Sequence, residues 1–401
     1  MAILKLKPGR EKSLHRKHPW VFSGAVFRLI DDGTALVPGS TVRIIDSKDE
    51  FLAWGAYSPD SQIRARVWSW DINQDINKSF FLARLEEAFS LRKTFISTET
   101  TNAFRLVHGE SDGLPGLIVD RYGDVIVVQF LSSGAEYWRQ TLTDLLAEYG
   151  ECESIYERSD ADSRSLEGLP ARSGLLWGRS LEGLVKVYEN DVDYWVDVVS
   201  GHKTGFYIDQ RDNRAAVRAL ASGRSVLDCF TYTGGFTLVA IKGGATSITS
   251  MDTSEGALDL ARTNLLLNNL DPTLVEWVAE DVFQTLRKYR DRNRKFDLII
   301  LDPPKFAPTT AQVQKAARGY KDINLLAFKL LNPGGILITF SCSGGVGEEL
   351  FQRIVAGAAL DAGKQARIVK RLSQAADHPV ALNFPEGAYL KGLVIQISDN
   401  K

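Results

Sequence analysis

Apolar and polar residues alternate in two different ways along this chain, and the change in period divides it into regions. Residues 41–46 and 62–68 alternate apolar with polar side chains at every second position, as half-buried strands do. The Pro-Gly pair at 38–39 is typical of a turn between such strands. The pattern therefore predicts a small β-barrel over residues 1–72.

A mixed pattern follows over residues 73–190. Apolar residues recur at helical spacing after Asn77, and two strand-like runs then flank a short polar stretch, which is typical of a β-hairpin. The expected strands are 117–120, 125–130 and 154–156, and a second helix is expected over 136–149. This region is therefore expected to form an α+β central module.

The last part of the chain, residues 191–401, alternates apolar strands with helical segments, which is the pattern of a doubly wound parallel sheet. Strands are expected at 224–230, 247–252, 296–302 and 335–340. Each apolar run ends in a polar residue at its carboxyl end, where open α/β sheets bind their ligands. The fold class is therefore α/β, with a Rossmann-like domain as the third of three domains.

Composition narrows the class of protein. A chain of 401 residues is long enough for two or three domains, and its 44% hydrophobic and 24% charged residues are those of an ordinary globular protein. Cys152, Cys229 and Cys342 are an odd number of widely separated thiols without zinc or thioredoxin spacing, which favours a reducing, cytoplasmic compartment. No apolar run reaches the roughly 18 residues of a membrane span, and the N-terminus lacks the apolar region of a signal peptide. No metal and no membrane partner are therefore expected.

The net charge of −2 hides a local excess of positive charge. Residues 1–30 hold seven Lys and Arg residues against one acidic residue, Glu11, and Trp20 and Phe22 lie among them. A second basic run occupies residues 287–295. Basic surfaces beside aromatic rings suit phosphate contacts and base stacking, whereas the alternative for each run is an ordinary solvated face. The first run makes a nucleic-acid partner a reasonable hypothesis.

Residues 228–236 carry an Asp, small and aromatic residues and two glycines where the first central strand passes into a helix. The glycines allow a cofactor to approach the backbone closely. The G-x-G-x-x-G spacing that holds a dinucleotide pyrophosphate is absent. S-adenosylmethionine has no phosphate; it needs backbone contacts for its amino-acid end and an acid for its ribose hydroxyls. Asp252, which ends the next strand, suits the ribose, and Asp281 suits the adenine, although a helix N-cap is the alternative for Asp281.

Two prolines follow Asp302 at the end of the next central strand. They hold φ at about −65° and stop the strand, so we expect the turn to present a carboxylate and backbone carbonyls to the cleft. Such a stiff turn suits a flipped nucleobase. A purely structural turn is the alternative.

Cys342 lies at the end of the following strand, between two serines. C5 of cytosine is a poor nucleophile, but addition of a thiolate to C6 would let C5 attack a sulfonium methyl group, and loss of the C5 proton would then expel the thiol. An acid near N3 would assist, and Asp302 is the candidate. A buried core thiol is the alternative for Cys342, and packing is the preferred interpretation of Cys229. Methylation of a uracil C5 or of a guanine nitrogen, or a non-catalytic RNA-binding assembly factor, are the competing hypotheses.

Motifs along nearly the whole chain resemble those of the RlmI family of bacterial 23S ribosomal RNA cytosine-C5 methyltransferases. The longest is residues 201–214, which read Gly-His-Lys-Thr-Gly-Phe-Tyr-Ile-Asp-Gln-Arg-Asp-Asn-Arg. The others are the segments 11–13, 18–26, 55–59, 109–116, 302–306 and 340–344. The resemblance implies that residues 1–72 are a PUA-type RNA-binding domain and that a class I methyltransferase domain ends the chain. It also implies S-adenosylmethionine as the cofactor and 23S rRNA, or a large-subunit assembly intermediate, as the partner.

With this resemblance the candidate site residues fall into three groups. Cys342 and Asp302 are the expected catalytic residues. The expected cofactor-binding residues are Gln210, Asp228, Phe230, Thr231, Gly234, Gly235, Asp252, Asp281 and Asp302. The expected RNA-binding residues are Lys12, Arg16, Lys17, Trp20 and Lys305. His108, His378 and Asp209 are further candidates for proton transfer, and a homodimer is compatible with the sequence.

Overall fold

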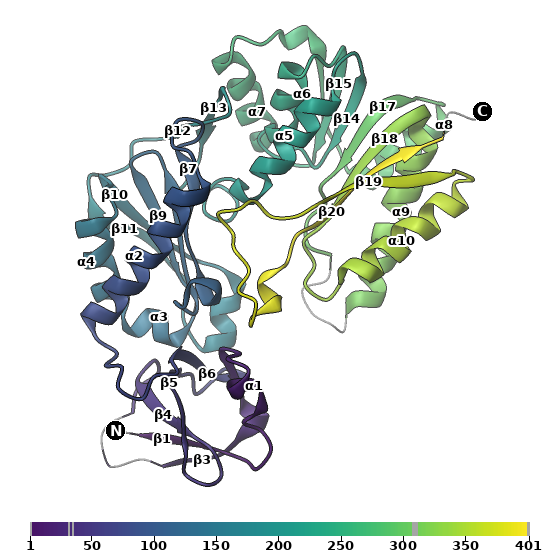
Figure 1. Cartoon of the computed structure of the whole chain (residues 1–401). Coiled ribbons are helices and arrows are strands. Elements are labelled where there is room, and N and C mark those ends of the chain that lie inside the picture. Colours follow the sequence, from purple (N-terminus) through teal and green to yellow (C-terminus); the bar gives the residue numbers. More distant parts are fainter. Residues whose placement is uncertain (1, 31–32, 34–35, 307–311, 399–401) are drawn as a thin grey trace. The chain divides into compact units, whose positions relative to one another are not determined.

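The computed structural model describes residues 2–30, 33, 36–306 and 312–398. The chain forms two compact units (Figure 1). The first holds Met1–Glu189, Val196–Ile208 and Ala376–Gly387, and the second holds Asn190–Trp195, Asp209–Ala375 and Ala388–Lys401. No helix of the described residues is long and apolar enough to cross a membrane. The three-domain division at residues 72 and 190 stays a prediction.

The N-terminal part of the first unit is a six-stranded sheet with strand order β2-β6-β5-β4-β1-β3. Its elements are β1 (Ile3–Leu6), α1 (Lys12–His15), β2 (Trp20–Phe22), η1 (Ser23–Ala25), β3 (Val26–Ile30), β4 (Thr41–Ile45), β5 (Phe51–Tyr57) and β6 (Ile63–Ser69). Alternate residues of these strands, such as Val42 and Ile44, are buried in one core. The strands predicted at 41–46 and 62–68 are thus confirmed as β4 and β6.

The rest of the first unit is built on a five-stranded sheet with strand order β11-β10-β9-β8-β7. Its elements are α2 (Lys78–Phe95), β7 (Ala103–His108), η2 (Gly109–Asp112), β8 (Leu117–Tyr122), β9 (Val125–Phe130), α3 (Ser133–Tyr137), α4 (Arg139–Tyr149), β10 (Ser154–Ser159), η3 (Asp162–Glu167), β11 (Arg172–Gly178) and β12 (Val185–Glu189). Phe81 and Leu85 of α2 pack with residues of β7, β8 and β9 in one core. The predicted hairpin is confirmed, and its first strand extends to Tyr122.

The helix predicted over residues 136–149 is confirmed from Arg139 to Tyr149 as α4, but the helical segment begins earlier, as α3, and is broken at Trp138. The Ser132 hydroxyl accepts a hydrogen bond from the Ala135 amide and begins the first helix early. At Trp138 the backbone leaves helical geometry (φ −92°, ψ 10°), and the ring packs against Phe81 with centroids 4.8 Å apart. The break lies where a bulky ring enters the core, which apolar periodicity alone does not reveal.

The second unit is built on a seven-stranded sheet with strand order β16-β15-β14-β17-β18-β20-β19. The elements from residue 192 onward are β13 (Val192–Val196), η4 (Ile208–Gln210), α5 (Arg211–Leu220), β14 (Ser225–Cys229), α6 (Gly235–Lys242), β15 (Ser247–Asp252), α7 (Glu255–Leu267), η5 (Pro272–Leu274), β16 (Val275–Ala279), α8 (Val282–Asp291), β17 (Phe296–Leu301), α9 (Val313–Leu330), β18 (Leu331–Ser341), α10 (Glu348–Asp361), β19 (Ala366–Leu372), η7 (Pro385–Gly387) and β20 (Lys391–Ile397). Strands β14 to β18 run parallel, whereas β20 is antiparallel to β18 and β19. The doubly wound α/β domain is thus confirmed.

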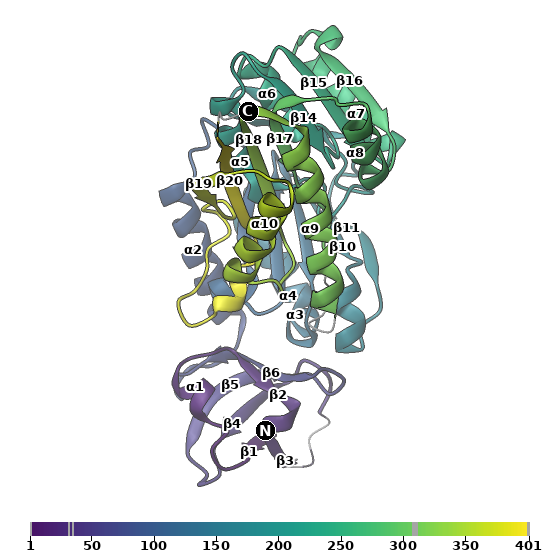
Figure 2. The same cartoon turned by 90° about the vertical axis from the view of Figure 1, so that its right-hand side faces the viewer.

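Helices cover both faces of this sheet (Figures 1 and 2). On one face α8, α9 and α10 bury apolar side chains against β14, β17 and β18, including Leu286, Leu326 and Val355. Helices α5, α6 and α7 lie on the other face. Because the parallel strands share one direction, their carboxyl ends meet at the same edge, and the residues that follow them form the candidate site.

Candidate active site

Asp228 lies near the carboxyl end of β14 and is fully buried. The hydroxyls of Thr231 and Thr237 donate hydrogen bonds to its Oδ2 atom at 2.6 and 2.7 Å. Burial raises the pKa of this carboxyl to about 6. Its other oxygen, Oδ1, has no hydrogen-bond partner among the described residues. The buried carboxyl therefore has an acceptor available for a ligand.

The turn after β14 has an unusual backbone. Phe230, Tyr232 and Gly234 have φ angles of 65°, 51° and 83°, in the left-handed region. The turn is held to the next strand, because the amides of Tyr232 and Ser254 each donate to the carboxylate of Asp252 at 3.0 Å. The carboxyl end of β15 thus lies directly beside the glycine turn.

These residues fit S-adenosylmethionine. Asp252 is partly exposed, and each of its oxygens has a further lone pair for a ribose hydroxyl. The unpaired Oδ1 of Asp228 suits a donor such as the ligand's ammonium group. Thr231 and Gly235 belong to the same buried turn, whose bends bring backbone groups toward the strand edge. When bound, S-adenosylmethionine supplies an electrophilic methyl group on a sulfonium.

Asp281 follows β16 and is the N-cap of α8. Its Oδ1 accepts a hydrogen bond from the Gln284 amide at 2.9 Å. The side chain is exposed, and β16 pairs in parallel with β15, so Asp281 belongs to the same edge of the sheet. The N-cap interpretation is confirmed, and the adenine contact stays a prediction.

Asp302 directly follows β17. The Gln210 side-chain amide donates to its Oδ2 at 3.0 Å, and Asn213 in turn donates to the Gln210 carbonyl at 2.6 Å. Burial and repulsion from the nearby acids Asp209 and Asp228 raise the pKa of Asp302 to about 7. The Asp302 carboxyl is therefore poised to hold or release a proton near neutral pH.

Cys342 follows β18, the strand next to β17 in the sheet. The two strands are parallel with Leu301 opposite Thr339, so Asp302 and Cys342 leave the same edge two residues apart in register. Cys342 is partly exposed, whereas Cys229 is fully buried. The structure thus brings together the two residues that the sequence predicts as catalytic, and the packing interpretation of Cys229 agrees with its burial.

Two residues that the sequence analysis missed surround the Cys342 turn. The hydroxyls of Tyr320, on α9, and Ser343 are 3.0 Å apart. The Lys391 ammonium, at the start of β20, donates to the Ser343 carbonyl at 2.9 Å and to the Tyr389 carbonyl at 2.7 Å. A lysine at the start of a largely apolar strand is the sequence signal that could have identified this position.

The predicted RNA-binding residues lie in different settings. Lys12, Arg16 and Lys17 are exposed on and after α1, and Lys305 is exposed after the Pro-Pro turn of the second unit. Trp20 is only half-exposed.

The ring of Trp20 is held within the first unit. Its Nε1 donates to Glu110 at 2.8 Å, and its ring packs on Phe384 with centroids 4.9 Å apart. Trp20 and Lys12 also line a cavity of about 330 Å³, beside Phe22, whose side chain is 50% exposed. Phe22 is therefore more accessible than Trp20.

The second basic run is largely neutralised by its own neighbours. Lys288 pairs with Glu280 at 2.7 Å, and Arg290 pairs with Asp291 at 2.8 Å. Two further pairs join Arg287 to Asp322 and Arg294 to Glu276. Of the two basic runs, the one at the N-terminus therefore keeps more of its charge exposed.

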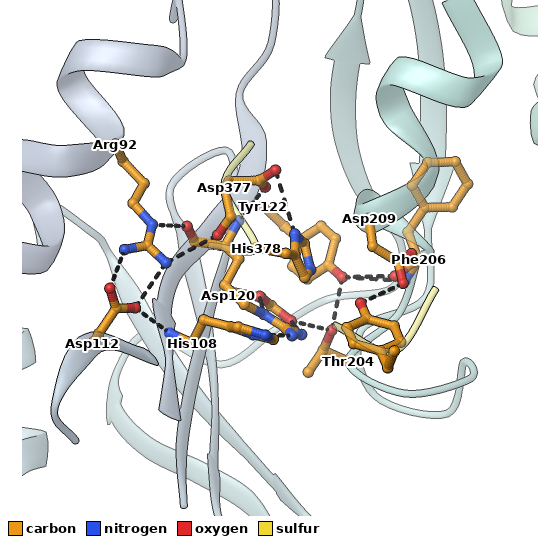
Figure 3. A network of polar contacts seen from close by, with 12 residues as sticks. Arg92, His108, Asp112, Asp120, Tyr122, Thr204, Phe206, Asp209, Asp377 and His378 are labelled. Atoms are coloured by element: carbon orange, nitrogen blue, oxygen red, sulfur yellow. Dashed lines mark hydrogen bonds and ion pairs between the residues drawn. The ribbon is translucent and has the colours of Figure 1, made fainter. Parts of the chain in front are cut away.

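The histidines considered for proton transfer belong to a buried polar network of the first unit (Figure 3). Arg92 binds both oxygens of Asp112 at 2.7 and 2.8 Å and donates to the Asp377 carbonyl at 2.9 Å. His378 lies beside the Asp377 carboxylate and His108. Burial lowers the pKa of His108 well below its usual value. This network fits a structural role for both histidines.

Family comparisons agree with the two kinds of domain seen in the fold. The family described as "PUA-like domain" matches residues 4–70, and the family described as "S-adenosylmethionine-dependent methyltransferase" matches residues 170–395. The PUA-type domain and the S-adenosylmethionine cofactor predicted from the sequence are thus confirmed.

Relatives match over nearly the full length. "Ribosomal RNA large subunit methyltransferase I" of Yersinia pseudotuberculosis is 51% identical over 395 residues, which cover 98% of this chain and 99% of the relative. A protein of the same name from Yersinia pestis matches to the same extent.

Two solved structures share the fold. A putative S-adenosylmethionine-dependent methyltransferase from Streptococcus mutans has a TM-score of 0.85 at 23% identity and covers 99% of this chain and 100% of its own. A putative methyltransferase complexed with SAH has a TM-score of 0.86 at the same identity and coverage.

Proposed function

We propose, from the premise that this chain belongs to the ribosomal RNA large subunit methyltransferase I family, that it transfers a methyl group from S-adenosylmethionine to C5 of a cytosine in 23S rRNA. The observation that carries the proposal is the pair of neighbouring strand ends from which Asp302 and Cys342 leave the sheet. A thiol and a proton-holding carboxyl beside one cofactor turn suit methylation of a pyrimidine carbon.

Cys342 acts as the nucleophile. Its Sγ, as the thiolate, forms a bond to C6, and the electron pair of the C5–C6 double bond moves to C5. C5 would then take the methyl group from the sulfonium, whose S–CH3 bond breaks to leave S-adenosylhomocysteine. A base removes the C5 proton, the double bond forms again, and the thiolate leaves. The partial exposure of Cys342 lets a base reach the sulfur, as this step requires.

Asp302 assists the addition as an acid. Because the pKa of its carboxyl is raised to about 7 by burial and by neighbouring acids, much of it is protonated at neutral pH. A protonated carboxyl donates a hydrogen bond to N3 of the base and withdraws electron density from C6. Gln210 holds the Asp302 carboxyl in place through its 3.0 Å hydrogen bond.

The exposed cations of the N-terminal domain bind the RNA backbone. Lys12, Arg16 and Lys17 provide phosphate contacts, and Trp20 lines the adjacent cavity. Lys305, next to the Asp302 turn, provides a contact near the target base. The substrate is 23S rRNA or a large-subunit assembly intermediate in the cytoplasm, and a homodimer is compatible with this assignment.

The test is a covalent trap. RNA carrying 5-fluorocytosine cannot lose a proton from C5, so the wild-type protein with S-adenosylmethionine should remain joined to the RNA on a denaturing gel. Cys342→Ala should form no adduct, whereas Cys229→Ala, which removes a buried thiol, should still form it. An adduct that persists in Cys342→Ala would refute the nucleophile assignment.

The same variants separate the other methylation reactions. A guanine nitrogen needs no thiol, so undiminished turnover by Cys342→Ser would favour nitrogen methylation instead. A uracil target is distinguished by the product, because mass spectrometry of digested rRNA would then show 5-methyluridine. If the proposed cytosine reaction is correct, the 23S rRNA of cells without the protein should lack one 5-methylcytidine.

A further inference from the structure

Lys391 is a buried cation in the second unit. It opens β20 opposite Ser341 of β18 and is only 8% exposed. Lysine is among the residues least often buried, because its ammonium loses hydration that the protein must replace. Its position one strand away from the Cys342 turn therefore calls for a physical explanation.

The hydrogen-bond partners of the ammonium among the described residues are neutral backbone carbonyls. It donates to the carbonyls of Ser343 and Tyr389, and both of these acceptors are uncharged. An ammonium has three donors, so a third one is available. A buried charge without a counter-ion is costly.

The charges around this ammonium identify the missing counter-ion. Cys342 and Glu348 favour the charged form of Lys391, whereas Lys305 disfavours it. Glu348 is the first residue of α10. Burial is the largest influence and lowers the pKa of Lys391. Tyr320 faces the same thiol from α9. Cys342 is the group next to the carbonyl that Lys391 already binds, and its ionised form would supply the absent negative charge.

We propose that the Lys391 ammonium stabilises the thiolate of Cys342 and fixes the turn that carries it, which makes Lys391 a positioning residue for the nucleophile. A cation beside a thiol favours ionisation, as in other reactive cysteines. The role of the thiolate in cytosine methylation rests on the proposed function, but its stabilisation by Lys391 does not.

The test measures thiolate formation without RNA. Iodoacetamide reacts with thiolates, so its rate at Cys342, followed by peptide mass spectrometry across pH, reports the pH midpoint of ionisation. Wild-type Cys342 should have a midpoint below the roughly 8.5 of a free cysteine. Lys391→Met, which keeps the chain length without charge, should raise the midpoint by about one pH unit or more, and Lys391→Arg should restore much of the shift.

Two controls keep the result specific. Lys370→Met removes an exposed lysine from the neighbouring strand β19 and should leave the midpoint unchanged. Cys152, in the first unit, should react alike in all variants. Binding of S-adenosylmethionine by calorimetry shows that each variant is folded.

Either of two results would overturn the proposal: a midpoint in Lys391→Met equal to that of wild type, or, should that variant fail to fold, a wild-type midpoint at or above 8.5. The outcome is independent of the covalent trap. Failure of the trap with an intact midpoint shift would refute the cytosine reaction and leave the Lys391 interaction standing.

Discussion

At the scale of single residues, two acids at the strand edge, Asp228 and Asp302, hold their protons to higher pH than ordinary carboxyls do. Burial raises the pKa of Asp302 to about 7 and that of Asp228 to about 6. A carboxyl whose pKa is higher in the folded than in the unfolded chain binds more protons when folded, so stability is lost as pH rises from about 4 toward 7. These two carboxyls therefore lower the stability of the protein at neutral pH relative to pH 4.

Asp302→Asn should stabilise the protein in a pH-dependent way. Asparagine keeps the acceptor for Gln210 and removes the buried charge, so the gain in free energy of unfolding should be larger at pH 8 than at pH 5 by about 1–3 kcal/mol. Thermal unfolding at the two pH values measures this difference. Asp75→Asn, at an exposed acid, is the control; an equal gain at both pH values would contradict the raised pKa.

At the scale of elements, the turn between β14 and α6 depends on a glycine. Gly234 has a φ of 83°, and a Cβ atom there would lie 2.9 Å from Leu238 Cδ1 and 3.0 Å from Ala261 Cβ. Both the backbone angle and the packing of α6 against α7 therefore exclude a larger residue. This close packing sets the bend that brings the turn beside Asp252.

Gly234→Ala should weaken cofactor binding and lower stability. The strained φ and the close contacts should cost about 1–3 kcal/mol, and the displaced turn should raise the Kd for S-adenosylmethionine several-fold, which calorimetry measures. Gly256→Ala is the matched control, because Gly256 lies in α7 with nothing within 4 Å of an added Cβ. Alanine there should leave binding unchanged and stabilise the helix slightly. Similar losses in both variants would refute the role of the turn.

At the scale of the whole molecule, charge is distributed unevenly although the net charge is only −2. The run at residues 287–295 is largely paired with acids of its own unit. The cations on and after α1 are exposed beside the cavity that Phe22 lines. We therefore expect RNA affinity to depend mainly on the N-terminal domain.

Replacing Lys12 and Arg16 together by Ala should weaken RNA binding and flatten its dependence on salt. Two lost phosphate contacts should reduce the slope of log affinity against log salt by about 1–2. Filter binding to an rRNA fragment at several salt concentrations measures both quantities. Lys288 and Arg290 replaced together are the matched control, because both are ion-paired; an unchanged slope for the first pair would remove α1 from the RNA surface.

Local patterns in the sequence were enough to predict where four central strands lie along the chain and that Asp302 and Cys342 belong to the same edge of the sheet, because parallel strands bring their carboxyl ends to one edge. Contacts between distant segments were not predictable. Gln210 and Asp302 are 92 positions apart, and Lys391 and Ser343 are 48 apart. Periodicity carries no signal for such pairs, and only the resemblance to a family pointed to Gln210.

The segment Ala376–Gly387 belongs to the first unit although it comes near the end of the chain. Arg92, buried in that unit, donates to the Asp377 carbonyl, and the Arg105 amide donates to the Asp377 carboxylate at 2.8 Å. During synthesis the buried arginine of this unit can therefore gain this acceptor only after residue 377 has been made, 285 positions later. Completion of this unit thus depends on a segment made long after its other parts, and a fragment ending at residue 189 would leave part of its interior uncovered.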